Sequence, residues 1–102
     1  MAEAVLRHFF GGFVRMHILY HAAKKPIWGV EIMGELGRHG YKLSPGTIYP
    51  LLAAMERSGF LRSRRERAGR RWRRLYRATR PGRRALGAAK EKVRELFREL
   101  YE

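Results

Sequence analysis

The sequence predicts a mostly α-helical fold with one small β-hairpin. Apolar residues recur at the three-and-four spacing of amphipathic helices in four segments, residues 2–23, 28–39, 44–58 and 79–102. Residues 61–78 instead alternate with period two on both sides of Ala68-Gly69, as expected for two short strands joined by a tight turn. A dense run of arginines coincides with this hairpin.

Positive charge is concentrated around the predicted hairpin. Of the 23 Lys and Arg residues, 12 lie between Arg62 and Arg84 beside a single acid, Glu66, so this stretch contributes +11 of the formal net charge of +14. All 12 are arginines, which can chelate phosphate or a guanine edge with two parallel donors. Mixed charge would serve solubility better. The pattern therefore favours a surface that attracts phosphate backbones.

Length and composition limit the classes of protein. A chain of 102 residues has room for one domain with a modest core, and such domains often gain stability by dimerising. The absence of cysteine excludes disulfides and thiolate metal sites. No basic-then-apolar leader begins the chain, and no apolar stretch approaches the roughly 18 residues that span a bilayer. We expect a cytoplasmic protein with no membrane association.

The first helix, Ala2 to Ala23, is apolar over more than half its circumference. Its predicted buried face comprises Leu6, Phe9, Phe10, Phe13, Met16, His17 and Tyr20, and Val14, Ile18 and Leu19 widen that face. A helix this apolar is either central to the core or shared with a partner subunit. Gly11-Gly12 interrupts the pattern and could bend the helix, which ends at Lys24-Lys25-Pro26.

A second helix, about Trp28 to His39, should direct Ile32, Met33 and Leu36 inward and end at Gly40 as a left-handed C-cap. Residues 41–43 then form a turn.

The third helix has clear start and stop signals. Ser44 is placed to cap it, Pro45 fits the first helical position and Gly59 closes the element. Its buried stripe is Ile48, Leu51, Leu52 and Met55. Its outer face is Gly46, Pro50, Ala53 and Arg57, flanked by Thr47 and Tyr49. Pro50 should kink the helix.

Within the hairpin, alternation divides the second strand into two faces. Trp72, Arg74, Tyr76 and Ala78 share one face, and Arg71, Arg73, Leu75 and Arg77 share the other. We expect the face of Tyr76 and Ala78 to cover the core. We expect Trp72 to pack against the aliphatic stems of arginines rather than to stack on bases.

Two helices joined by a short turn and followed by a hairpin form a winged helix-turn-helix, in which the third helix enters the DNA major groove. The predicted DNA-binding residues are Lys42, Ser44, Pro45, Gly46, Thr47, Tyr49, Pro50, Arg57, Arg65, Arg67, Arg70, Arg71 and Arg73. Backbone N–H groups at residues 44–47, with Lys42, should hold a phosphate. Few of these side chains can read bases, so DNA shape should supply much of the specificity. Tyr49 could instead pack between helix and wing.

The last helix follows Thr79 as its cap and carries a heptad seam. Leu86, Ala89, Val93, Leu96 and Leu100 are spaced 3, 4, 3 and 4, with Phe97 alongside. This seam could pack on the chain's own first helix, but it favours a partner helix. The predicted dimer interface is Phe9, Phe13, Leu86, Ala89, Val93, Leu96, Phe97 and Leu100. Residues 1–80 would form the DNA-binding domain and 81–102 the dimerisation helix, and the dimer would bind an inverted repeat.

The residues do not suggest catalysis. The chain has no aspartate, its glutamates form no paired constellation, and no glycine-rich phosphate loop follows a strand. His17 and His21 are four apart and could chelate a metal, but no carboxylate or thiolate lies near them in sequence. We expect them to be packing or interface residues. The sequence therefore predicts a binding protein that is not an enzyme and uses no metal or cofactor.

Several motifs together resemble the PadR family of transcription regulators. They are the Ser44-Pro45-Gly46-Thr47-Ile48-Tyr49-Pro50-Leu51-Leu52 run, the wing end Tyr76-Arg77-Ala78-Thr79, and Pro81-Gly82-Arg83 at the start of the last helix. The resemblance implies a dimeric winged-helix repressor, often released by phenolic or other small hydrophobic effectors. Three positions differ from the usual family pattern. The family's G-Y-E-I reads Gly29-Val30-Glu31-Ile32 here, Trp28 stands where a histidine is common, and Ala78 replaces a larger apolar residue. Candidate effector residues are Phe9, Phe13, Trp28 and Phe97.

Two other functions remain open from the sequence alone. Arginines could bind nucleic acid without sequence choice, in an architectural or RNA-binding protein, or the basic wing could contact an acidic protein partner. The well-defined ends and flat outer face of the third helix favour sequence-specific double-stranded DNA, because an architectural protein needs no groove-reading helix.

Overall fold

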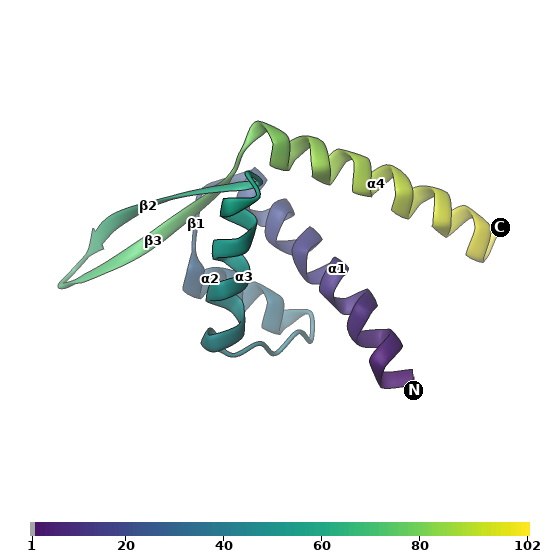
Figure 1. Ribbon diagram of the computed structural model, residues 1–102, viewed down its shortest axis with the longest axis horizontal. Coiled ribbons are helices and arrows are strands. Elements are labelled where there is room, and N and C mark those ends of the chain that lie inside the picture. Colours follow the sequence, from purple (N-terminus) through teal and green to yellow (C-terminus); the bar gives the residue numbers. More distant parts are fainter. Residues whose placement is uncertain (1) are drawn as a thin grey trace.

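The computed structural model describes residues 2–102, with side chains from Val5 onward. The elements in chain order are α1 (Ala2–Lys24), β1 (Ile27–Trp28), α2 (Gly29–Arg38), α3 (Pro45–Arg57), β2 (Leu61–Ala68), β3 (Arg71–Ala78) and α4 (Arg80–Tyr101). In Figure 1 the β2–β3 hairpin extends from one side of the α2–α3 pair, and α1 and α4 extend towards the opposite side. The fold is the predicted winged helix-turn-helix with an additional helix at each end.

The core lies where α1, α2 and α3 meet the base of the hairpin. Its fully buried large side chains are Ile18, Ile32, Leu36, Ile48, Leu52 and Leu61. Tyr76 and Ala78 are also buried, so the predicted core face of the wing is confirmed. The inward residues of α2 and α3 are confirmed as well, with Met33 and Leu51 only partly buried at the edge of the core.

The predicted buried face of α1 is confirmed only in part within a single chain. Val14, Ile18 and Leu19, which were predicted to widen that face, are buried in the core together with Ala22. Phe9, Phe13 and Tyr20 are about half exposed, at 55%, 46% and 48%. At 100° per residue, Phe13 and Tyr20 lie on the side of the helix opposite Ile18. The helix is apolar nearly all round. One stripe of it is therefore buried in the chain's own core, and the aromatic stripe is exposed to solvent.

The sheet has a strand that the sequence did not indicate. Its order is β1-β3-β2, with β1 antiparallel to β3 through Ile27↔Tyr76 and Trp28↔Leu75. β1 is only two residues long and leads directly into α2, so it has no period-two pattern to detect. The hairpin itself is as predicted, except that the turn is Gly69-Arg70, with Gly69 at φ 66°.

The ends of the helices agree with the sequence at most positions. Gly40 and Gly59 have the left-handed backbone expected after α2 and α3, at φ 89° and 86°. The Thr79 hydroxyl caps α4 by accepting from the Gly82 N–H at 3.0 Å. Neither Gly11-Gly12 nor Pro50 interrupts its helix. Pro50 is the sixth residue of α3, so it removes only the hydrogen bond to the carbonyl of Gly46.

The capping role predicted for Ser44 is not observed. Ser44 occupies the N-cap position of α3, but its side chain makes no hydrogen bond to the helix backbone. Its hydroxyl instead donates to the Thr47 Oγ1 at 3.3 Å. The Ser44 carbonyl accepts from the N–H groups of Thr47 and Ile48, at 3.0 and 2.9 Å, and these bonds start the helix.

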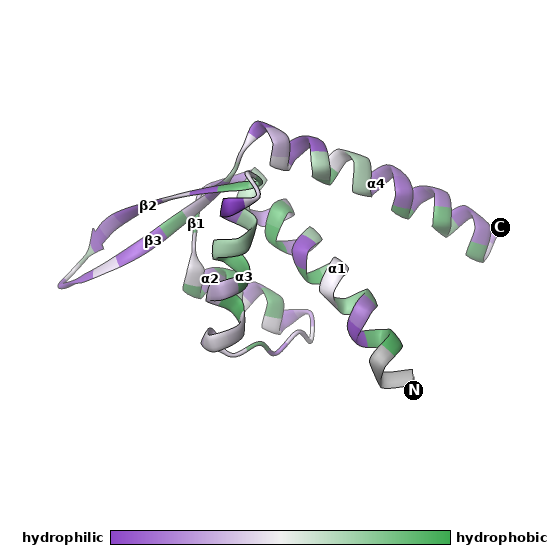
Figure 2. Cartoon of the chain, viewed as in Figure 1, coloured by the Kyte–Doolittle hydropathy of each residue, from purple (hydrophilic) through white to green (hydrophobic). Residues whose placement is uncertain are grey.

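The two terminal helices carry most of the exposed large apolar side chains. Leu86 packs against the edge of the core, whereas every residue from Lys90 to Glu102 is exposed. Figure 2 shows apolar segments recurring along both α1 and α4, alternating with polar ones.

None of the helices within residues 2–102 has the length and apolar character needed to cross a membrane.

Candidate nucleic-acid interface

The outer face of α3 is open to solvent. Gly46, Thr47, Pro50, Ala53 and Arg57 are all exposed, as is Lys42 in the preceding turn. Small and proline side chains on this face allow the helix backbone to come close to another surface. Since Pro45 has no N–H and that of Thr47 bonds to Ser44, the amides of Ser44 and Gly46 are left to hold a phosphate. The predicted phosphate site therefore has fewer backbone N–H groups than the sequence suggested.

Tyr49 lies between α3 and the start of α2. A Cβ atom added at Gly29 would lie 2.8 Å from the Tyr49 Cε1, so the phenol ring lies directly against the Gly29 backbone. The same ring lines a hollow of about 430 Å³ together with Trp28, Trp72 and Arg74. Tyr49 remains 41% exposed, so it can both pack there and present its hydroxyl to a ligand.

The predicted wing arginines do not all share one face. The register pairs Arg65 with Arg74 and Arg67 with Trp72, so these four side chains lie on the core-facing side of the hairpin. Arg71 and Arg73 lie on the other side, and Arg70 sits in the turn. The guanidinium carbons of Arg65 and Arg67 stack over the Trp72 ring, at 5.1 and 5.3 Å from its centroid. Trp72 therefore packs against arginines as predicted, with their guanidinium groups rather than their aliphatic stems over the ring.

We call the residues Arg65, Arg67, Trp72 and Arg74 the front face of the wing. The only acid of the hairpin, Glu66, lies on the back face, where its carboxylate accepts from the Arg64 Nε at 2.6 Å. The positive charge of the back face is thus partly neutralised, while the four residues of the front face include no acid. Arg74 was not among the predicted DNA-binding residues, although its position two residues from Trp72 places it on this face.

A polar network fixes the wing to α3. The Glu56 carboxylate accepts from the Ser63 N–H at 3.0 Å and from the Ser63 hydroxyl at 2.8 Å. The Ser63 Oγ in turn accepts from the Arg74 Nη1 at 3.2 Å. Glu56 is at the end of α3 and Ser63 near the start of β2, so the network helps to set the angle between the two elements that carry the candidate interface.

Glu56→Ala should loosen this junction. The variant cannot form the two bonds to Ser63 in a partly buried environment, so the free energy of unfolding should fall by about 1–3 kcal/mol. Urea denaturation measures the change. Glu99→Ala, at an exposed position of α4, is the matched control and should change stability by less than about 0.5 kcal/mol. Equal stabilities for the Glu56→Ala and Glu99→Ala proteins would show that the network contributes little.

The four candidate effector residues are not brought together in one chain. Phe13 lines an open groove of about 650 Å³ between α1, the end of α2 and α4. Trp28 lies elsewhere, in the hollow beneath the wing. Phe9 and Phe97 are 55% exposed and line neither cavity. The aromatic content of the sequence could not reveal that Trp28 lies in β1, at the N-cap of α2, on the side of the wing.

The groove also holds histidines. Its lining includes Met16, His17, Tyr20, His21, His39, Tyr41, Leu86, Lys90 and Val93 besides Phe13. Burial lowers the pKa of His17, and the nearby His39 and His21 lower it further. Burial also lowers the pKa of His21, partly opposed by the carboxylate of Glu35. Both rings are therefore predominantly neutral near pH 7.

Known proteins share this sequence and this architecture. Residues 18–88 match the model of the transcriptional regulator PadR-like family. The transcriptional regulator Rv3488 of Mycobacterium tuberculosis is 45% identical over 95 residues, which cover 93% of this chain and 89% of that protein.

Solved structures agree with the fold. A PadR family regulator from Eggerthella lenta is 25% identical, with a TM-score of 0.83, over 97% of this chain and 88% of its own. Bacillus subtilis PadR in complex with operator DNA has a TM-score of 0.65 and 24% identity, over 74% of this chain and 46% of its own. The sequence matches establish that this chain belongs to the PadR-like family of transcriptional regulators, and the solved structures share its fold.

Proposed function

We propose that this regulator binds a palindromic operator as a homodimer and represses transcription. One observation carries the proposal. The exposed outer face of α3 lies beside the front face of the wing, which has no acidic residue. A helix in the major groove and a basic wing on the flanking backbone use both surfaces at once. Bacillus subtilis PadR, which shares the fold, is known in complex with operator DNA.

The dimer is supported by apolar surface that one chain leaves uncovered. On α1 and α4, the exposed large apolar side chains are Val5, Leu6, Phe9, Phe10, Phe13, Tyr20, Val93, Leu96, Phe97, Leu100 and Tyr101. Exposed large apolar side chains gathered on two helices are typical of a protein interface. Residues 81–102 would act as the dimerisation helix and residues 1–80 as the DNA-binding unit, with Phe9, Phe13 and the α4 seam between subunits.

A two-fold dimer places its two α3 helices on two half-sites about 34 Å apart. Each half-site would be held by Lys42, Ser44 and Gly46 at a phosphate, with Thr47 and Pro50 against bases and Arg57 at the far end. Repression needs only occupancy of an operator that overlaps a promoter. Because the protein would act on operator DNA, we expect it in the cytoplasm.

Removal of wing arginines should weaken binding to all DNA sequences alike. The double substitution Arg67→Ala and Arg70→Ala should reduce the slope of log K against log salt by about one for each phosphate that the wing no longer neutralises. Arg64→Ala is the control, because Arg64 lies on the back face and is paired with Glu66. Fluorescence anisotropy with random duplexes at several salt concentrations measures both slopes. An unchanged slope in the double variant would place the DNA elsewhere.

The experiment that tests sequence-specific binding is the ratio of affinities for operator and random DNA. Thr47→Ala and Tyr49→Ala should lower this ratio, by roughly 1–3 kcal/mol for each interaction with a base that the substitution removes, while random DNA binds nearly as before. A ratio that neither variant changes would contradict the role of α3 and favour a non-specific architectural or RNA-binding protein.

A small hydrophobic effector would occupy the groove at Phe13, where subunits meet and α2 leads towards α3. Tryptophan fluorescence would not report on it, because Trp28 and Trp72 both line the hollow beneath the wing. Release of operator DNA by a member of a panel of phenolic compounds, abolished by Phe13→Ala, would support this site. Release that Phe13→Ala leaves unchanged would place the effector elsewhere.

A further inference from the structure

Three of the four histidines of the chain converge on one point. His17 and His21 lie one turn apart on α1, and His39 is the C-cap residue of α2. Their ligand nitrogens all lie within 4.8 Å of one another. The fourth histidine, His8, is an exposed residue nearer the start of α1 and is not in the cluster.

The spacing suits a transition-metal ion after small side-chain rotations. Two imidazole nitrogens bound to one tetrahedral zinc ion at 2.0–2.1 Å are about 3.3 Å apart. The rings of His17 and His39 are stacked at 4.5 Å, with 26° between their planes, so one ring must turn to aim its nitrogen at a shared ion. His39 is exposed at the end of α2 and has room for this rotation.

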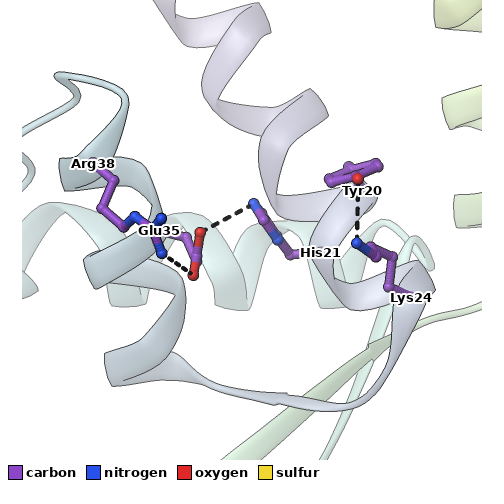
Figure 3. A network of polar contacts seen from close by, with 5 residues as sticks. All are labelled: Tyr20, His21, Lys24, Glu35 and Arg38. Atoms are coloured by element: carbon purple, nitrogen blue, oxygen red, sulfur yellow. Dashed lines mark hydrogen bonds and ion pairs between the residues drawn. The ribbon is translucent and has the colours of Figure 1, made fainter.

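One ligand atom of the cluster is buried without a hydrogen bond. The Nε2 of His21 has no hydrogen-bond partner among the described residues. In Figure 3, His21 points from α1 towards Glu35 on α2, whose carboxylate oxygen lies 3.8 Å away. That distance is too long for a hydrogen bond. Buried polar atoms are nearly always paired, so an unpaired nitrogen in a cluster of three histidines indicates a missing partner.

The surrounding charges define what the site can hold. Glu35 is the nearby acid, and the Arg38 Nη1 contacts its carboxylate at 3.5 Å. The Lys24 ammonium lies on the other side of His21 and donates to the Tyr20 hydroxyl at 3.3 Å. Neutral imidazole nitrogens are common metal ligands. Imidazole ligands suit zinc, nickel, cobalt and copper rather than magnesium or calcium.

We propose that His17, His21 and His39 bind one divalent transition-metal ion of the zinc class, with the Glu35 carboxylate or a water as fourth ligand. The ion connects α1 to the end of α2. From there Gly40 and the turn at residues 41–43 lead directly into α3, so bound metal restrains the segment that positions the groove-facing helix. The sequence alone pointed away from this site because His39 and Glu35 are distant from His17 and His21 along the chain.

Cobalt titration of the untagged protein tests the site. Co²⁺ should bind at one ion per chain and give the visible absorption of a low-symmetry, four-coordinate site. His39→Ala and His17→Ala should each weaken binding by about 100-fold or more, since even outer-shell changes cost 10–100-fold. His8→Ala is the matched control and should bind as the natural chain does. Because His39 and His8 are exposed, both variants should keep the fold, which circular dichroism checks.

A thermal measurement gives an independent readout that needs no DNA. Zinc should raise the melting temperature of the natural chain and of His8→Ala, and should leave that of His39→Ala unchanged, because only a ligand of the folded state stabilises it. The proposal is overturned if the natural chain binds no Co²⁺, or if His39→Ala binds as tightly as His8→Ala. Neither result bears on operator binding, so this site and the proposed function can fail separately.

Discussion

Gly82→Ala should be among the most destabilising single substitutions in this protein. A Cβ atom at position 82 would lie 2.1 Å from the Phe60 carbonyl oxygen, which is backbone and cannot rotate away. The same oxygen accepts the Thr79 N–H at 3.1 Å, so moving it would also break the junction between the wing and α4. We expect a decrease of about 3 kcal/mol or more in the free energy of unfolding, a large fraction for a small domain.

Gly87→Ala is the control for Gly82→Ala. It lies on the same helix with nothing within 4 Å of the added atom, so the better helix propensity of alanine should stabilise the protein by up to about 1 kcal/mol. Chemical denaturation of both variants measures the opposite shifts. If Gly82→Ala were as stable as the natural chain, the close approach of α4 to Phe60 would be wrong.

Leu96→Glu should abolish dimerisation without unfolding the chain. Leu96 lies on the α4 seam and is 54% exposed in the single chain, so its replacement removes nothing from the core. In a dimer the glutamate would be buried without a partner, at a cost of several kcal/mol. Operator affinity should fall about 100-fold or more, because the second half-site is then no longer bound intramolecularly.

Sedimentation equilibrium and anisotropy with an operator duplex measure the two effects of Leu96→Glu. Ala88→Glu adds the same charge at an exposed position of α4 outside the heptad seam, and it should stay dimeric and bind the operator as the natural chain does. A Leu96→Glu protein that remained a dimer would move the interface away from the α4 seam.

The sequence predicted the elements whose signals are local. Gly40, Gly59 and Gly69 marked turns that need a left-handed backbone, and Thr79 marked the start of α4. The inward residues of α2 and α3 followed from helical spacing. These features depend on a few neighbouring residues, so pattern and local stereochemistry are sufficient to place them.

The remaining features depend on packing between segments that are distant along the chain. β1 exists only because β3 offers it an edge, and the division of wing arginines into two faces depends on the hairpin register. Because α1 is apolar over most of its circumference, the sequence pattern could not show which stripe of the helix faces the chain's own core. His39 reaches His17 and His21 only through the packing of α2 on α1, and no spacing rule could connect them.

Selection of bound sequences from a random duplex library, at about 150 mM salt where non-specific binding is weakened, tests the central claim most directly. We expect enrichment of an inverted repeat whose half-sites are centred about one helical turn apart, as two α3 helices of a dimer require. Tight, salt-sensitive binding that enriches no motif would contradict the account and identify the chain as a non-specific nucleic-acid-binding protein.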